Sequence, residues 1–143
     1  MKHPFLAAAL SALVAAPVAA HDFGFAGILS SDNMEELEEI TLSVGKPLAD
    51  KPLMLKSGTG YELEITSDGT GELALEGSGF FRAIWINEIV INDLEIRPFG
   101  IESLEFDDEG TMEIEFIAIK PGQYFLRIPG SSGESQRVDI IIQ

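Results

Sequence analysis

The chain has 143 residues, of which 24 are Asp or Glu and only 9 are Lys or Arg, so its formal net charge is −15. With 45% hydrophobic residues it can build a core, which argues against general disorder, and its length allows one ordinary domain with or without a leader. The negative charge excludes nucleic acid and anionic lipid as partners, because both repel an acidic surface. The absence of cysteine excludes disulfides, thiolate metal sites and cysteine nucleophiles.

The first 20 residues have the three parts of a secretory signal peptide. Lys2 supplies the positive charge, a short apolar segment follows, and residues 18–20 (Val-Ala-Ala) form a small-residue cleavage site. The apolar segment is shorter than the roughly 20 residues that a membrane span needs, so we expect no membrane insertion. The sequence therefore predicts a signal peptide over residues 1–20, a single mature domain over residues 21–143, and a periplasmic or secreted location.

One stretch near the start of the mature chain favours a helix. Asp32 and Glu35 form an Asp-x-x-Glu capping pattern, and the glutamates of residues 35–39 suit a helix N-terminus. We expect a single short helical turn there.

Period-two alternation dominates the chain after residue 60 and predicts half-buried strands, because successive side chains of a strand point to opposite faces of its sheet. Turn residues separate these segments, which is typical of an antiparallel sandwich or a small barrel. Glutamates occupy many outward positions, so much of the negative charge is expected on solvated sheet faces. The expected inward residues are Tyr61, Leu63 and Ile65; Leu73 and Leu75; Met112, Ile114 and Phe116; and Val138, Ile140 and Ile142.

Two segments in the middle of the chain need separate treatment. Asn92 and Asp93 lie between two apolar runs and predict a two-residue hairpin turn. The apolar block that begins at Phe80 and Phe81 and includes Trp85 is consistent with a buried strand or with a helical excursion. These three aromatic residues form either an exposed recognition patch or part of the core, and we expect them in the core.

Catalysis is limited by the residues that are missing. The only imidazole after the leader is His21, and the chain contains no nucleophile elbow, phosphate-binding loop or H-E-x-x-H motif. Carboxylate-based hydrolysis stays open in principle, but 24 acidic residues single out no pair. We therefore expect the protein not to be an enzyme.

His21 is the most informative single residue. Cleavage after Ala20 would give His21 an α-amino nitrogen beside its imidazole, a chelate suited to Cu(II), to which Asp22 adds an oxygen. His21 and Asp22 are thus the candidate metal ligands of a periplasmic copper-binding protein or carrier. The alternative is a solvated terminus with no cofactor. Met34, Met54 and Met112 are candidate soft ligands for Cu(I) or, more commonly, core residues.

Two acidic clusters, residues 35–39 and 107–109, are candidate sites for Ca²⁺ or for a basic periplasmic protein. Neither matches the D-x-[DN]-x-[DN]-G calcium loop, so the alternative is a solvated helical turn and a hairpin tip. A basic partner would be attracted by either cluster in a salt-dependent way.

The C-terminal part of the chain, residues 104–143, resembles the end of the cupredoxin domain. An apolar strand runs through residues 116–120 to Pro-Gly-x-Tyr (121–124), Ile-Pro-Gly (128–130) resembles the ligand loop, and residues 137–142 resemble the closing strand. Upstream, residues 60–65 and the Phe80–Phe81 pair look like an earlier strand and the segment after the first ligand.

This resemblance implies an all-β, antiparallel Greek-key β-sandwich with at most a short helix. The family binds type 1 copper with two His, one Cys and usually a Met. Here Leu126 stands near the position of the Cys, and Ser131 stands at the position of a His. The resemblance thus implies a cupredoxin-like binding or accessory protein without the family's copper site.

Overall fold

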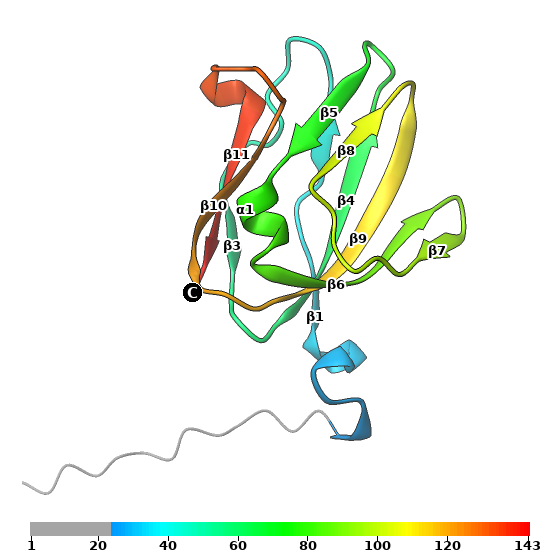
Figure 1. Cartoon of the computed structure of the whole chain (residues 1–143), viewed down its shortest axis with the longest axis vertical. Helices are drawn as coiled ribbons and strands as arrows, with labels where there is room; N and C mark the ends of the chain where they lie inside the picture. Colours follow the sequence, from blue (N-terminus) through cyan, green and yellow to red (C-terminus); the bar gives the residue numbers. More distant parts are fainter. Residues whose placement is uncertain (1–23) are drawn as a thin grey trace, which may run out of the picture.

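The computed structural model describes residues 24–143 as two β-sheets packed face to face, with only short helices (Figure 1). The expected leader and the candidate metal ligands His21 and Asp22 lie outside the described residues. Among the residues described, no helix is long and apolar enough to cross a membrane.

The first sheet, sheet A, has six strands in the order β1-β4-β9-β6-β7, and β2 also pairs with β4. Its long central strands carry the alternating segments that the sequence predicted. The strands of sheet A are β1 (Met34–Glu36), β2 (Ile40–Leu42), β4 (Gly60–Ser67), β6 (Ile84–Ile91), β7 (Leu94–Ile96) and β9 (Gly110–Ala118).

The second sheet, sheet B, has five strands in the order β3-β11-β10-β5-β8. Its strands are β3 (Leu53–Leu55), β5 (Leu73–Glu76), β8 (Ser103–Phe106), β10 (Gly122–Arg127) and β11 (Arg137–Ile142). The helices are η1 (Gly24–Leu29), η2 (Ser31–Asn33), α1 (Ser78–Phe81) and η3 (Glu134–Gln136).

The β-sandwich expected from the sequence is confirmed. Most strand pairs are antiparallel, whereas β1 and β2 run parallel to β4, and β3 runs parallel to β11. The three strands that join in parallel are each only three residues long. Such short segments show no period in the sequence, which is why the alternation predicted the long strands and not these additions.

The inward faces of the two sheets form the core. The ring of Phe116 on β9 lies 5.8 Å from the ring of Tyr61 on β4 and 5.5 Å, edge to face, from the ring of Phe80 on α1. All the residues expected to point inward on β4, β9 and β11 are buried. The alternation of these strands is therefore confirmed residue by residue.

The helical turn expected within residues 32–39 is wrong in its extent. Ser30, not Asp32, is the N-cap of η2, which ends at Asn33, and Glu35 and Glu36 lie in strand β1. The physical reason is Asn33: its buried Nδ2 donates to the carbonyl oxygens of Ile28 (2.8 Å) and Gly58 (3.0 Å), which directs the chain into β1 beside β4.

The middle segments resolve as follows. Asn92 and Asp93 have φ of 49° and 63°, and they join β6 to β7 in the predicted hairpin. The apolar block is divided between the two alternatives, since α1 contains Phe80 and Phe81 and the strand β6 begins at Ile84. Residues 107–109 are not a hairpin tip, because they join β8 of sheet B to β9 of sheet A.

Candidate functional site

The outer face of sheet A brings glutamates of several strands together. Tyr61, Leu63 and Ile65 of β4 point inward, so the residues between them point outward, where Glu62 pairs across the strands with Glu115 and Glu64 with Glu113. Further strands add to this set. We call six of these outward glutamates the carboxylate face: Glu36, Glu62, Glu64, Glu88, Glu113 and Glu115.

Burial first, and then the like charges of this face, raise the pKa values of its two central members on β9. Burial raises the pKa of Glu113, and the charges of Glu62, Glu64 and Glu115 raise it further. Burial also raises the pKa of Glu115, as do the charges of Glu88 and Glu62, while a hydrogen bond from Asn87 Nδ2 (2.9 Å) opposes the shift. Like charges directly opposite each other destabilise a sheet. The fold therefore carries a cost on this face.

Few cations offset this cost. Within residues 24–143, Arg97 is the only cation that forms an ion pair with the carboxylate face, at 2.9 Å from Glu88, and it also contacts Glu95 at 2.8 Å. The two central strands, β4 and β9, contribute four glutamates that form no such pair. At one edge a hollow of about 240 Å³ is lined by Glu36, Leu37, Glu39, Glu62 and Glu64. The face is thus a strong attractor of positive charge.

An apolar row borders the carboxylate face at its lower end. Met34, Ile117 and Trp85 lie on the same outer face. The side chains of Met34 and Ile117 fill the space over Gly60, which pairs with both residues, and Trp85 pairs with Ile117. Ile117 is 1% exposed although it points away from the core, whereas Trp85 is 46% exposed. Trp85 is therefore available for contact.

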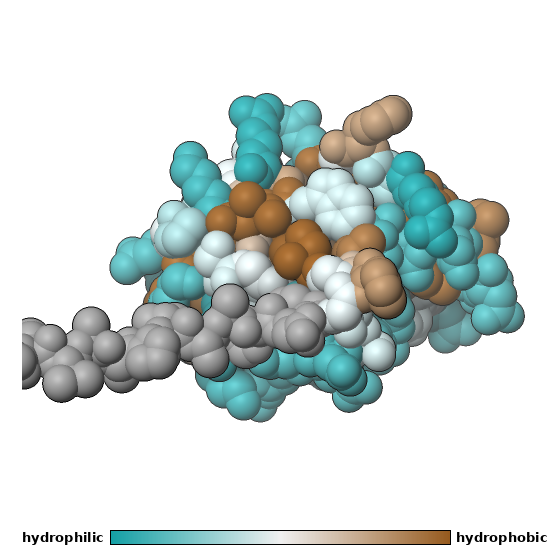
Figure 2. Space-filling model, turned by 90° about the horizontal axis from the view of Figure 1, so that it is seen from below, coloured by the Kyte–Doolittle hydropathy of each residue, from teal (hydrophilic) through white to brown (hydrophobic). Residues whose placement is uncertain are grey.

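The expectation that Trp85 fills the core is wrong, whereas the same expectation for Phe80 and Phe81 is confirmed. The alternation of β6 explains the difference: Ile86 points inward, so its neighbour Trp85 points outward. Figure 2 shows this end of the molecule, where apolar side chains gather at the centre with hydrophilic ones around them. The exposed residues Ile28 and Ile119 belong to this end, since Asn33 bonds to the carbonyl oxygens of Ile28 and Gly58, and Ile119 N bonds to the Ala83 carbonyl oxygen.

The three methionines considered as copper ligands are not brought together. Met34 lies on the outer face of sheet A, Met112 is buried on its inner face, and Met54 is exposed on the outer face of sheet B. Two sheets separate Met54 from Met34, so these residues do not share a site.

The two positions that the cupredoxin resemblance assigns to copper ligands have structural roles. Leu126 is fully buried, and its Cδ2 lies against Gly77. The Ser131 hydroxyl donates to the carbonyl oxygen of Ile128 at 2.6 Å and so closes a turn after β10. An aliphatic side chain and a hydroxyl already bonded to the backbone provide no type 1 copper ligands.

The acidic cluster at residues 107–109 contributes one member to a carboxylate group that the sequence did not indicate. Oxygens of Glu72, Glu105 and Asp107 lie within 4.8 Å of one another, and all three residues are exposed. Glu105 lies in β8, Asp107 directly follows β8 and Glu72 directly precedes β5; these two strands pair in sheet B, which only the register reveals. Exposure leaves these carboxylates hydrated.

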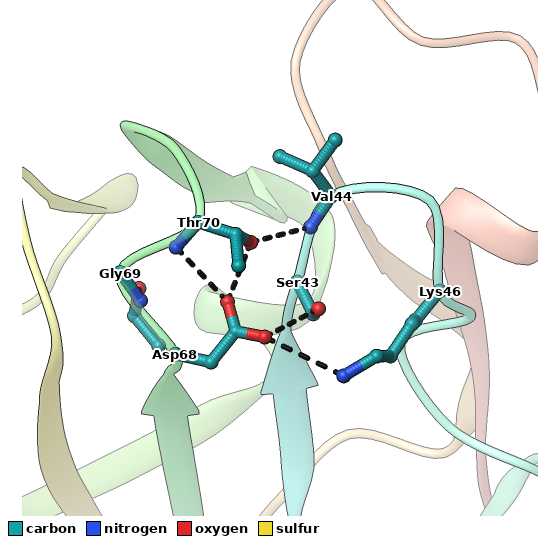
Figure 3. A network of polar contacts seen from close by, with 7 residues as sticks. Ser43, Val44, Lys46, Asp68, Gly69 and Thr70 are labelled. Atoms are coloured by element: carbon teal, nitrogen blue, oxygen red, sulfur yellow. Dashed lines mark hydrogen bonds and ion pairs between the residues drawn. The ribbon is translucent and has the colours of Figure 1, made fainter.

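A further polar network lies at the end of the sandwich that is remote from Trp85, and it links two loops (Figure 3). The Asp68 carboxylate accepts hydrogen bonds from Ser43 Oγ (2.5 Å), Thr70 Oγ1 (2.5 Å) and Thr70 N (3.1 Å), and Lys46 Nζ lies 3.5 Å away. The bonds from Ser43 and Thr70 hold the pKa of Asp68 well below its usual range. Each oxygen already has partners, so this cluster stabilises the fold.

Comparison with solved structures establishes the fold. A multicopper oxidase from Pseudomonas thermotolerans aligns with a TM-score of 0.54 and 14% identity over 78% of this chain, and one from Campylobacter jejuni aligns with a TM-score of 0.50 and 10% identity over 76%. This chain spans about 30% of the length of each. The described residues therefore have the cupredoxin-like fold.

At the level of sequence, no protein-family model matches the chain, and no curated protein is significantly similar to it. The similarity to the multicopper oxidases is therefore one of fold and not of sequence. The ligand positions described above are where the chain departs from copper-binding cupredoxins, since it has no cysteine for a type 1 site.

Proposed function

We propose that the chain is a non-enzymatic binding or accessory protein, exported to the periplasm or secreted, that binds a basic protein through the carboxylate face. The observation that carries this proposal is the direct pairing of Glu62 with Glu115 and of Glu64 with Glu113 on two neighbouring strands. Lysine or arginine residues of a partner would remove the repulsion within these pairs, so part of the cost of folding would return as binding free energy.

Trp85 gives the partner an apolar contact beside the charges. Interfaces draw much of their affinity from a few large side chains, tryptophan and arginine above all, surrounded by polar contacts. The half-exposed Trp85, with Met34 and Ile117 behind it, meets this description. A partner segment that carries basic residues and one apolar side chain fits both parts of the surface.

The test uses a short poly-lysine peptide as the probe and isothermal titration as the measurement. In the face variant, Glu62, Glu113 and Glu115 are replaced by Gln. In the matched control, three exposed acidic residues elsewhere, Asp50, Glu109 and Glu134, become Asn, Gln and Gln, so both variants lose the same charge.

We expect the face variant to bind about tenfold more weakly than the control, a difference of about 1.4 kcal/mol. Trp85→Ala should weaken the binding of two probes to different degrees. The loss of affinity should be larger for a lysine peptide that contains a single leucine than for poly-lysine. If the face variant and the control lose affinity equally, net charge alone attracts the probe and the proposed surface is wrong.

A further inference from the structure

The outer face of sheet B contains a groove where two of its strands separate. β10 and β5 pair only at Arg127 and Glu76, although each pairs at length with its other neighbour. Beyond that point α1 takes the place of β5 beside β10 (Figure 1). Gly77 permits this approach, because a Cβ there would collide with Leu126 and lie 3.0 Å from the Phe125 carbonyl oxygen. The result is an open groove of about 720 Å³.

The groove combines aromatic and acidic walls. Phe80, Tyr124 and Phe125 line it, and three carboxylates, Glu76, Glu102 and Glu105, stand around them. No lysine or arginine is among the residues that line this groove, but two arginines contact its walls: the Arg137 guanidinium lies 4.5 Å from the centroid of the Phe125 ring, and Arg127 lies 3.8 Å from Glu76. A cavity of this size with an aromatic surface and a few convergent charged groups is typical of a ligand site.

The carboxylates of the groove are available to a ligand. Arg127 Nε lies 3.8 Å from Glu76 Oε1, which is too long for a hydrogen bond, and this buried Nε has no hydrogen-bond partner. Glu102 and Glu105 are exposed and form no ion pair within residues 24–143. Glu105 also belongs to the group with Glu72 and Asp107, which extends the negative field beyond the groove.

We propose that this groove binds an organic cation with an apolar stem, that is, an alkylammonium or a guanidinium group carried on a chain of methylenes. The charged group meets Glu102 and Glu105, and the stem lies against Tyr124 beside Gly79, and against Phe125 away from the Arg137 guanidinium. Cations bind favourably to aromatic faces, and alkyl stems bury against apolar surface while their charged ends stay at the rim. The groove lies on the outer face of sheet B, so this site is separate from the carboxylate face of sheet A.

Gly79 provides a steric test. It lines the groove, its φ lies outside the left-handed region, and an added Cβ would make only an ordinary contact of 3.8 Å with Tyr124 Cδ1. Gly79→Leu therefore fills the groove, whereas Gly79→Ala leaves it open and is the matched control. Both substitutions favour a helix over glycine, so both proteins are expected to fold, which thermal unfolding checks.

The probes are spermidine and the capped peptide N-acetyl-Lys-Ala-Lys-amide. Binding of each is measured from the amide chemical shifts of the protein at about 0.15 M salt. We expect shifts at residues 77–80 and 123–125, and a loss of affinity of about tenfold in Gly79→Leu but not in Gly79→Ala. Tighter binding of spermidine identifies a free amine as the ligand, and tighter binding of the peptide identifies side chains of a protein.

A charge pair completes the test. The double variant Glu102→Gln/Glu105→Gln should weaken spermidine binding, whereas Glu62→Gln/Glu64→Gln on the other sheet should change it little. The proposal is overturned if neither probe shifts the groove residues, if Mg²⁺ reproduces the same shifts with equal affinity, or if Gly79→Leu binds as the wild type does. These outcomes leave the poly-lysine test of the carboxylate face unaffected.

Discussion

Glu64 on β4 lies directly across the strands from Glu113 on β9, and both point away from the core. Sheets commonly place opposite charges or β-branched residues in such pairs, because like charges there reduce stability. The next outward pair along, Glu62 and Glu115, repeats the arrangement. The repulsion is therefore a property of the whole central part of this face.

The first prediction concerns Glu113→Gln. The pKa of Glu113 is raised by burial and by its neighbours, so its ionised form destabilises the fold, a cost that appears as the pH rises through the folded pKa and is absent below the ordinary value of 4.5. We expect the variant to gain about 0.5 kcal/mol of unfolding free energy at pH 7, and nothing at about pH 3.5. Urea unfolding measures both, with Glu109→Gln as the control. An equal gain at both pH values would contradict the electrostatic cause.

The second prediction concerns Asp68, whose ionised form stabilises the fold, in contrast to that of Glu113. Its pKa is lowered in the fold by hydrogen bonds from Ser43 and Thr70, so it stabilises the protein above the ordinary value of 3.8, and that contribution is lost as the pH falls through the lowered folded pKa. Asp68→Asn should lower Tm at pH 7, and the difference from wild type should shrink below pH 3.8. Asp50→Asn, at an exposed carboxylate outside any acidic cluster, serves as the control and should leave Tm unchanged.

The third prediction compares alanine substitutions at Gly77 and Gly60, whose neighbouring atoms differ in how easily they can move. In Gly77→Ala the new methyl group meets Leu126 and the backbone carbonyl of Phe125, so we expect a loss of about 1–3 kcal/mol. In Gly60→Ala the nearest atom is the sulfur of Met34, at the end of a flexible side chain, so the loss should be smaller. Chemical denaturation of the two variants tests the order, which would be reversed if α1 shifts more easily than Met34.

The β6–β7 turn predicts a stabilising substitution. Asn92 and Asp93 both have positive φ, as a type I′ turn requires, and glycine adopts this conformation at the second position with less strain than aspartate. Asp93→Gly should raise the unfolding free energy by about 0.5 kcal/mol. Asp93→Ala removes the same charge without the conformational freedom and should lower it. A gain in both variants would show that the charge, not the turn, matters.

The copper alternative depends on His21. If mass spectrometry shows that the mature chain begins at His21, Cu(II) titration should give one bound ion in the wild type and a large loss of affinity in His21→Ala. A mature chain that begins at any other residue lacks the paired α-amino and imidazole nitrogens. That result would end the copper alternative while leaving the carboxylate face as proposed.

The sequence predicted the features that depend on a residue and its immediate neighbours. Alternation identified the buried members of β4, β9 and β11, and the Asn92–Asp93 turn followed from local backbone preference. It also placed glutamates on outward faces. Alternation gives no register, however, so the sequence did not show that Glu62 meets Glu115.

The features that depend on distant contacts were missed for related reasons. The helical pattern at Asp32 was overridden by the bonds that Asn33 makes to Ile28 and Gly58. The exposure of Trp85 depends on where β6 begins, because this sets which residues point outward. The uninterrupted apolar sequence there gives no sign of that position. The groove required the separation of β10 from β5, and no single segment records it.

The position of β11 has a consequence for how the chain matures. This strand, residues 137–142, lies between β3 and β10 and pairs with both, so it joins segments that are otherwise about 70 residues apart in the sequence. A nascent chain that has been synthesised only as far as β10 lacks the strand that joins β3 to the rest of sheet B. Sheet B therefore closes only after β11 has been synthesised, and because this pairing joins distant segments of the chain, we expect the closure to be slow.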